Sequence, residues 1–171
     1  SRFFYQFLDT AGNILSGKSF ASSSTTSTER CDIKEYNKRY YIVIGNEMIK
    51  LDSTGNVILR KRIGNGISDL TNIHFISGSK MILTGTSNEI MSVSSRYDIT
   101  QVCIDTSGTV SWIKIFGNEL SEVEYESYDY GDHIFTIFQY TGNYSNPQFF
   151  ILKTDTLGNQ VWCKGMNGTF S

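Results

Sequence analysis

Several residue types and motifs are scarce or missing from this 171-residue sequence, which has one proline, three cysteines and two histidines. No Cys-x-x-Cys pair or Cys/His cluster is present, so the common zinc sites are excluded. Phosphate-binding loops, HExxH motifs and ordered Ser/His/Asp motifs are also absent. No apolar run approaches the roughly 20 residues of a membrane-spanning helix. The net charge of −2 gives no basic field that would attract nucleic acid.

The residues that are abundant favour β-structure. Ten tyrosines, eleven phenylalanines and fifteen glycines accompany many β-branched residues. Aromatic and β-branched side chains are enriched in strands, and glycine supplies the tight turns between them. The composition therefore predicts an all-β protein made of many short strands.

One short phrase, Asp-x-x-Gly-[Asn/Thr], occurs four times, starting at Asp9, Asp52, Asp105 and Asp155, with intervals of 43, 53 and 50 residues. The aspartate suits a type I turn in which its carboxylate accepts backbone hydrogen bonds, and the glycine suits a positive φ. This is the chemistry of a short bulged loop between two antiparallel strands. Each phrase is therefore predicted to be the tip of a β-hairpin.

Strand-like runs surround each phrase. The runs expected before the tips are Phe4–Leu8, Met48–Leu51, Gln101–Ile104 and Phe150–Lys153, and those expected after them include Val57–Arg60 and Val110–Ile115. Two further strands are expected upstream in the later copies: Cys31–Tyr36 with Tyr41–Gly45, Leu70–Ile76 with Met81–Gly85, and Val123–Tyr128 with Ile134–Phe138. Short turns, such as the one at Asn37, separate the two strands of each pair.

Four antiparallel strands in every 40 to 50 residues are typical of the blades of a β-propeller. We therefore predict a single propeller segment spanning 1–171, a β-propeller-like array of about three and a half blades, with blade parts at roughly 1–20, 31–66, 69–118 and 122–168. The alternative fold is a β-sandwich. Open sheet edges at both ends would invite pairing, so we expect the ring to be completed by further blades of the same protein or by another copy.

One position of the repeat favours a large apolar side chain. Four residues after the glycine stand Leu59, Trp112 and Trp162, whereas the first copy has Ser16 there, next to Leu15. We expect these side chains to anchor each blade, and the first copy to be the weakest.

The segments from Asp105 to Trp112 and from Lys153 to Trp162 resemble the blade signature of bacterial secreted β-propeller repeat proteins, especially those of the Bacteroidetes cell surface. The phrase is also similar, more distantly, to the tryptophan-docking repeat of quinoprotein-like propellers. It differs from the sialidase Asp-box in the spacing between aspartate and glycine. The resemblance implies a propeller fold and an extracellular or cell-surface location, and no catalytic residue is carried over from it.

Two further groups of residues have alternative interpretations. Carboxylates are dense between Glu119 and Asp132; they would suit Ca²⁺, with Glu122, Glu124 and Asp129 as the candidate ligands, or a solvated edge strand with one apolar face. No cofactor is otherwise expected. Cys31, Cys103 and Cys163 are expected to be buried free thiols, or one disulfide with a leftover thiol. His74 and His133 lie apart in the sequence, as is typical of structural or exposed histidines.

In an up-and-down blade the successive connections alternate between opposite faces. The long connections Ser19–Arg30, Ser87–Ile99 and Tyr140–Gln148 must then share one face, which is where recognition usually occurs. Six residues in them suit stacking and hydrogen bonding with a sugar or a protein surface: Arg96, Tyr97, Asp98, Tyr140, Asn143 and Tyr144.

Modification is also predicted at the hairpin tips. Thr10, Ser53 and Thr156 follow the aspartate as in the acceptor of Bacteroidetes exported glycoproteins, although turn chemistry alone also selects Ser or Thr there. The sequence as a whole predicts a non-catalytic extracellular binding or structural module, such as part of an adhesin. The alternative is a fragment of a propeller lyase, hydrolase or quinoprotein whose active site lies in absent blades.

Overall fold

The computed structural model describes residues 2–21, 30–64, 66–88, 97–117, 122–140 and 148–166, which form strands and turns and no helix. The strands are β1 (Arg2–Leu8), β2 (Ile14–Ala21), β3 (Cys31–Tyr36), β4 (Arg39–Ile44), β5 (Glu47–Leu51), β6 (Val57–Arg62), β7 (Ile67–Phe75), β8 (Lys80–Ser87), β9 (Asp98–Asp105), β10 (Val110–Phe116), β11 (Glu122–Tyr130), β12 (His133–Tyr140), β13 (Gln148–Asp155) and β14 (Gln160–Met166). The described part of the chain accordingly contains no helix that could cross a membrane.

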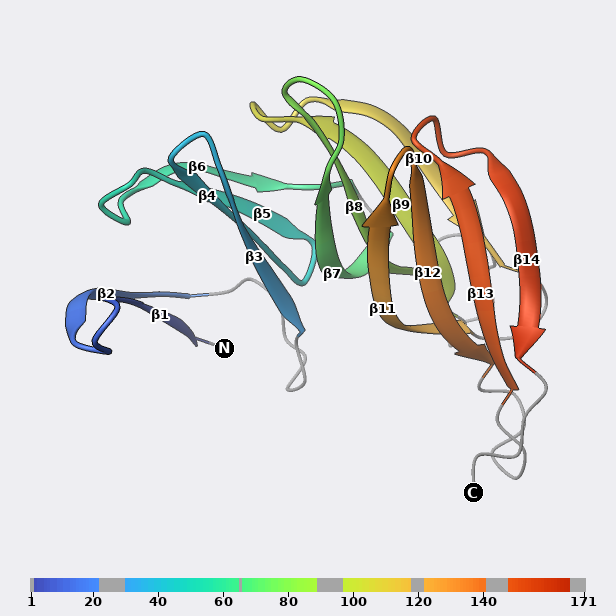
Figure 1. Ribbon diagram of the computed structural model, residues 1–171, viewed down its shortest axis with the longest axis horizontal. Coiled ribbons are helices and arrows are strands. Elements are labelled where there is room, and N and C mark those ends of the chain that lie inside the picture. The colour runs from blue at the N-terminus through green and yellow to red at the C-terminus, as the bar shows by residue number, and fades with distance from the viewer. Residues whose placement is uncertain are drawn as a thin grey trace.

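The strands form one two-stranded sheet, β1–β2, and three four-stranded antiparallel sheets, β3–β6, β7–β10 and β11–β14. Within each sheet the strands follow one another in chain order, so every sheet is a meander of consecutive hairpins. The sheets stand side by side along the array, with β1–β2 at one end and β14 at the other (Figure 1). The prediction of an all-β, propeller-like array is confirmed, with one half-sheet followed by three complete sheets.

The four predicted hairpin tips have the same geometry. In each tip the aspartate Oδ1 accepts the backbone N–H groups two and four residues ahead, at 2.8 to 2.9 Å. The tip glycines have φ between 76° and 85°, which is the left-handed region, and a register shift follows in each hairpin. The phrase therefore codes for a type I turn closed by a glycine bulge, as predicted.

The shorter hairpins at the start of each four-stranded sheet use a different turn. Asn37 and Lys38 connect β3 to β4 with φ of 51° and 58°. In the equivalent turns Gly78 and Gly131 have positive φ and open space around them. Lysine is an unusual residue in this conformation, because its Cβ is crowded there.

The apolar core lies between neighbouring sheets. The largest cluster joins the second and third sheets, with Tyr41, Val43 and Met48 on one side and Leu70 and Met81 among those on the other. Smaller clusters join the first sheet to the second, and the third to the fourth. Each sheet is therefore held by burial against its neighbours, as expected for stacked blades.

The predicted anchor position contacts the hairpin tip of the following sheet. A methyl group placed on Gly158 would lie 2.8 Å from the ring of Trp112, and one on Gly108 would lie 3.7 Å from Leu59. In the first repeat the anchor position holds the small Ser16, and the ring of Phe7 lies against Gly55 in its place. The anchor therefore packs between successive sheets, which explains why the first copy can lack it.

The cysteines form no disulfide among the described residues, and only Cys103 is buried. Cys31 and Cys163 are exposed, so the expectation of burial is wrong for both. Cys31 lies in a first strand and Cys163 in a last strand of its sheet, and neither strand is covered on both faces there. The central position of Cys103 in β9 accounts for the difference.

Candidate functional site

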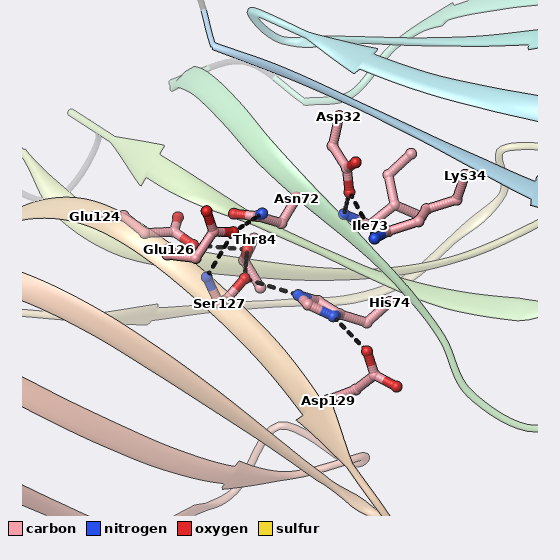
Figure 2. A network of polar contacts seen from close by, with 10 residues as sticks. All are labelled: Asp32, Lys34, Asn72, Ile73, His74, Thr84, Glu124, Glu126, Ser127 and Asp129. Carbon is pink, nitrogen blue, oxygen red and sulfur yellow. Dashed lines mark hydrogen bonds and ion pairs between the residues drawn. The ribbon is translucent and has the colours of Figure 1, made fainter.

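The polar side chains of the molecule gather where the first strands of the three complete sheets meet. β3 contacts β7, and β7 contacts β11. The side chains involved come from β3, β7, β8 and β11, and Figure 2 shows them pointing toward one another. Asp32 Oδ2 accepts the backbone N–H of Ile73 at 2.9 Å, and Asn72 Nδ2 donates to Glu126 Oε1. These contacts join all three sheets through polar groups.

A continuous chain of hydrogen bonds runs through the buried part of this region. Asp129 Oδ1 lies 3.1 Å from His74 Nδ1, and His74 Nε2 lies 2.7 Å from Ser127 Oγ. Ser127 Oγ lies 2.6 Å from Thr84 Oγ1, and Thr84 Oγ1 lies 2.8 Å from Glu124 Oε1. Of these residues only Asp129 is exposed to solvent.

The number of protons in this series of hydrogen bonds, from Asp129 to Glu124, is constrained. It has four contacts, each of which needs one hydrogen. The two hydroxyls and a neutral imidazole supply one each, so the fourth hydrogen requires a charged His74 or a protonated carboxyl group on Asp129 or Glu124. Burial raises the pKa of Glu124 to about 7 and lowers the pKa of His74. Both shifts favour a protonated Glu124 beside a neutral His74.

The burial of these carboxylates corrects one prediction. Glu122 and Glu124 are each 1% exposed, so the interpretation of this stretch as a solvated edge strand is wrong for them. The cause is that β11, although it is the edge strand of its sheet, packs on β7 and β8. A register shift between Glu124 and Glu126 further changes the alternation of side chains along the strand.

The predicted metal ligands do not form a cluster. Glu124 faces Thr84, whereas Asp129 lies on His74 near the other end of β11. The described residues contain no group of three or more His, Cys, Asp or Glu side chains that could hold a metal ion.

Two cavities adjoin the network. The first has a volume of about 330 Å³, and the second, of about 420 Å³, shares Arg30 and Thr71 with it. The first cavity is lined by Arg30, Ser68, Asp69, Thr71, Thr86, Tyr97, Val123 and Glu124. The second is lined by Arg30, Cys31, Asp32, Lys34, Thr71, Asn72 and Glu126.

Arg30 is the residue that connects the cavities to β11. Its Nη1 donates to the backbone oxygen of Glu124 at 2.6 Å. Glu124 itself lines the first cavity, and its Oε2 is buried with no hydrogen-bond partner among the residues described by the structure. A buried oxygen of this kind favours a ligand that brings its own donor.

The structure places three of the six predicted binding residues. Tyr97 is 43% exposed and lines the first cavity, while its backbone oxygen accepts the N–H of Glu122 at 2.7 Å. Asp98 is buried at the start of β9, and Tyr140 packs against Phe150 with ring centroids 4.4 Å apart. Tyr97 and Tyr140 line different cavities. Arg96, Asn143 and Tyr144 lie outside the described residues.

The predicted modification sites lie at hairpin tips. Thr10 and Ser53 are exposed, and Thr156 is half-buried. Thr10 lies in the tip of the first sheet, Ser53 in that of the second and Thr156 in that of the fourth.

Asp129, His74 and Ser127 have the hydrogen-bond order of a hydrolase triad. However, His74 and Ser127 are each 3% exposed, and neither lines any of the three cavities lined by Arg30, Tyr97 or Tyr140. Ser127 also shares its hydroxyl with Thr84. A nucleophile must reach its substrate, and this serine does not.

Most of the residues of this region are absent from the sequence-based predictions. Arg30 precedes β3, whereas Asp69 and Thr84 lie in β7 and β8 of one sheet, and the three residues have no motif spacing in common. Tyr97 and Glu124 are the two predicted candidates that the fold brings to one cavity. No sequence signal could have paired them, because their proximity depends on the packing of β9 and β11.

Comparison with protein-family models and with curated proteins finds no match for this chain. The resemblance of its hairpin phrases to secreted propeller repeats therefore stays a prediction. What the chain does must be inferred from the cavities and from the residues that line them.

Proposed function

We propose that this protein is a non-catalytic extracellular binding module whose first cavity holds one unit of a carbohydrate. The observation that carries this proposal is the lining, in which the half-exposed Tyr97 lies at the same cavity as the carboxylates of Asp69 and Glu124. Flat aromatic rings cover the apolar faces of sugars, and carboxylates accept hydrogen bonds from their hydroxyls.

The remaining lining residues fit the same ligand class. Arg30 contributes donors, and Ser68, Thr71 and Thr86 contribute hydroxyls. The volume of about 330 Å³ lies near the lower limit of roughly 300 to 1,000 Å³ for small-molecule sites. A polar ligand of one or two rings would fill it, whereas a protein partner would touch only its rim.

The test is binding of the full chain to an array of bacterial and animal oligosaccharides, followed by calorimetry with the best ligand. Tyr97→Ala is expected to weaken binding by about threefold to tenfold, because an aromatic stacking contact is worth roughly 0.5 to 1.5 kcal/mol. Tyr130→Ala is the matched control, since Tyr130 is 80% exposed and lies at a turn far along the strand from Glu124. Absence of any glycan binding, or equal binding by both variants, would reject the proposal.

The competing function, a fragment of a propeller hydrolase, is favoured by the order of Asp129, His74 and Ser127. It predicts that a fluorophosphonate probe labels Ser127 in the folded protein. We expect no labelling, because the serine is buried and its hydroxyl is shared with Thr84. Labelling that is lost in Ser127→Ala would favour the enzyme instead.

A further inference from the structure

Among the described residues, each hairpin tip after the first docks on the sheet that precedes it. The second tip, around Gly55, lies against Phe7 of the first sheet, and the Tyr5 hydroxyl donates to the backbone oxygen of Gly55. Lys18 Nζ of the first sheet donates to Asn56 Oδ1 of the same tip. The third and fourth tips dock in the same direction on the second and third sheets.

The docking surface of the second sheet is made by its last two strands. A methyl group on Gly108 would lie 2.8 Å from Lys61 Cδ and 3.7 Å from Leu59 Cδ2. Lys50 Nζ donates to the backbone oxygen of Thr106 in the same tip at 3.1 Å. A tip is thus held by an apolar anchor and by two lysines that approach its carbonyl and glycine.

The fourth sheet carries the same surface in the same register. Lys153 pairs with Trp162 across β13 and β14, as Lys50 pairs with Leu59 across β5 and β6. Lys153 Nζ lies 5.3 Å from the ring centroid of Phe135, and Lys50 Nζ lies 5.3 Å from that of Tyr41. Lys164 stands over Trp162, with its Nζ 5.1 Å from the ring centroid. None of the four tips of the described residues docks on this surface.

The first tip has the structure of a docked tip but docks on none of the described sheets. It has the same turn hydrogen bonds as the tips that are docked, and open space surrounds Gly12 where the other tip glycines meet a neighbouring sheet. Hydrogen bonds from Asn13 lower the pKa of Asp9, so this tip is negatively charged at neutral pH. The surface formed by Lys153 and Lys164 carries the opposite charge.

We propose that the first tip, residues 9–13, docks on the Trp162 surface of a second copy of this chain. In this joint Gly12 lies on Trp162, Lys153 donates to the backbone oxygen of Thr10, and Lys164 donates to Asn13. The first tip and the Trp162 surface of one array cannot meet each other, because β1–β2 and β14 lie at its opposite ends (Figure 1), and a second copy supplies the complementary part. Such a joint is heterologous, so it closes a ring or extends as an open chain of copies.

The test is sedimentation velocity of the full chain in reducing buffer over a range of concentrations. Wild-type protein is expected to associate, and Gly12→Asn and Lys164→Glu are each expected to weaken association by about tenfold or more. Asparagine tolerates a positive φ, so Gly12→Asn keeps the turn while adding a side chain that meets Trp162.

The matched controls are Gly78→Asn and Lys80→Glu, which change an open positive-φ glycine and an exposed lysine away from the joint. Both are expected to associate like wild type. A mixture of Gly12→Asn with Lys164→Glu restores one intact joint per pair, so it should associate more strongly than either variant alone.

Three results would overturn the joint. They are a wild-type protein that stays monomeric at about millimolar concentration, association that neither variant weakens, and a mixture that associates no better than its components. Since the two variants lie at opposite ends of the array, misfolding of one leaves the other as a valid test.

Discussion

Substituting glutamine for Glu124 should abolish most of the pH dependence of stability between pH 5 and pH 8. Burial raises the pKa of this carboxyl from an ordinary 4.5 to about 7. The folded protein then keeps a proton that the unfolded chain releases. The stability linked to Glu124 is therefore fully present below about pH 4.5 and is lost as the pH rises through about 7.

The magnitude follows from the size of the shift. One pKa unit corresponds to 1.36 kcal/mol, and the group is fully buried, so the loss amounts to about 3 kcal/mol by pH 8. In Glu124→Gln the amide oxygen can accept the hydrogen bond that Thr84 Oγ1 donates to Glu124 Oε1, and the amide is neutral like the protonated acid. The variant should match wild type near pH 5 and exceed it by about 2 to 3 kcal/mol near pH 8.

The assay is urea denaturation of both proteins at pH 5, 6, 7 and 8. Burial lowers the pKa of His74, which removes stability as the pH falls below about 6.5, but this contribution is common to both proteins and cancels in their difference. Glu35→Gln, an exposed carboxylate on β3, controls for the loss of a negative charge. A difference between Glu124→Gln and wild type that is the same at pH 5 and pH 8 would refute the reasoning.

Three other outcomes are expected. Lys38→Gly should stabilise the protein by about 0.5 to 1 kcal/mol, because glycine relieves the positive φ of 58° in the β3–β4 turn; thermal unfolding measures this. Gly131→Ala should lower the free energy of unfolding by about 1 to 2 kcal/mol through backbone strain alone, whereas Gly158→Ala should lower it further because Gly158 also lies against Trp112. Equal losses for the two variants in urea denaturation would contradict the contact between the tip and Trp112. The thiol of Cys103 should react with a thiol reagent only after unfolding, whereas the exposed thiols of Cys31 and Cys163 should react in the native protein. Equal reaction rates for all three thiols would contradict the burial of Cys103.

The local structure of the chain could be predicted from its sequence, because each hairpin is specified by neighbouring residues. Asp105 and Gly108 fix a turn within five residues, and the alternation beside them gives the strands. The four-stranded grouping followed from the spacing of the phrase. These features need no knowledge of distant parts of the chain.

The candidate site could not be predicted in the same way. The alternation of carboxylates in the sequence predicts that Glu124 lies on the surface, and only the packing of β11 on β7 and β8 buries it. His74 and Ser127 are 53 positions apart and meet through the contact of two sheets. The anchors were located correctly, but their contact with the next tip depends on the angle between neighbouring sheets.

The directional fit of each turn to the sheet before it has a consequence for how such chains change over evolutionary time. Each four-stranded sheet carries both a tip and the surface that receives the next tip, so a whole sheet can be duplicated or deleted and its neighbours still fit each other. A deletion that begins or ends within a sheet leaves a tip or a docking surface without its counterpart. Recombination should therefore favour gains and losses of entire units, with crossover points in the connections between sheets.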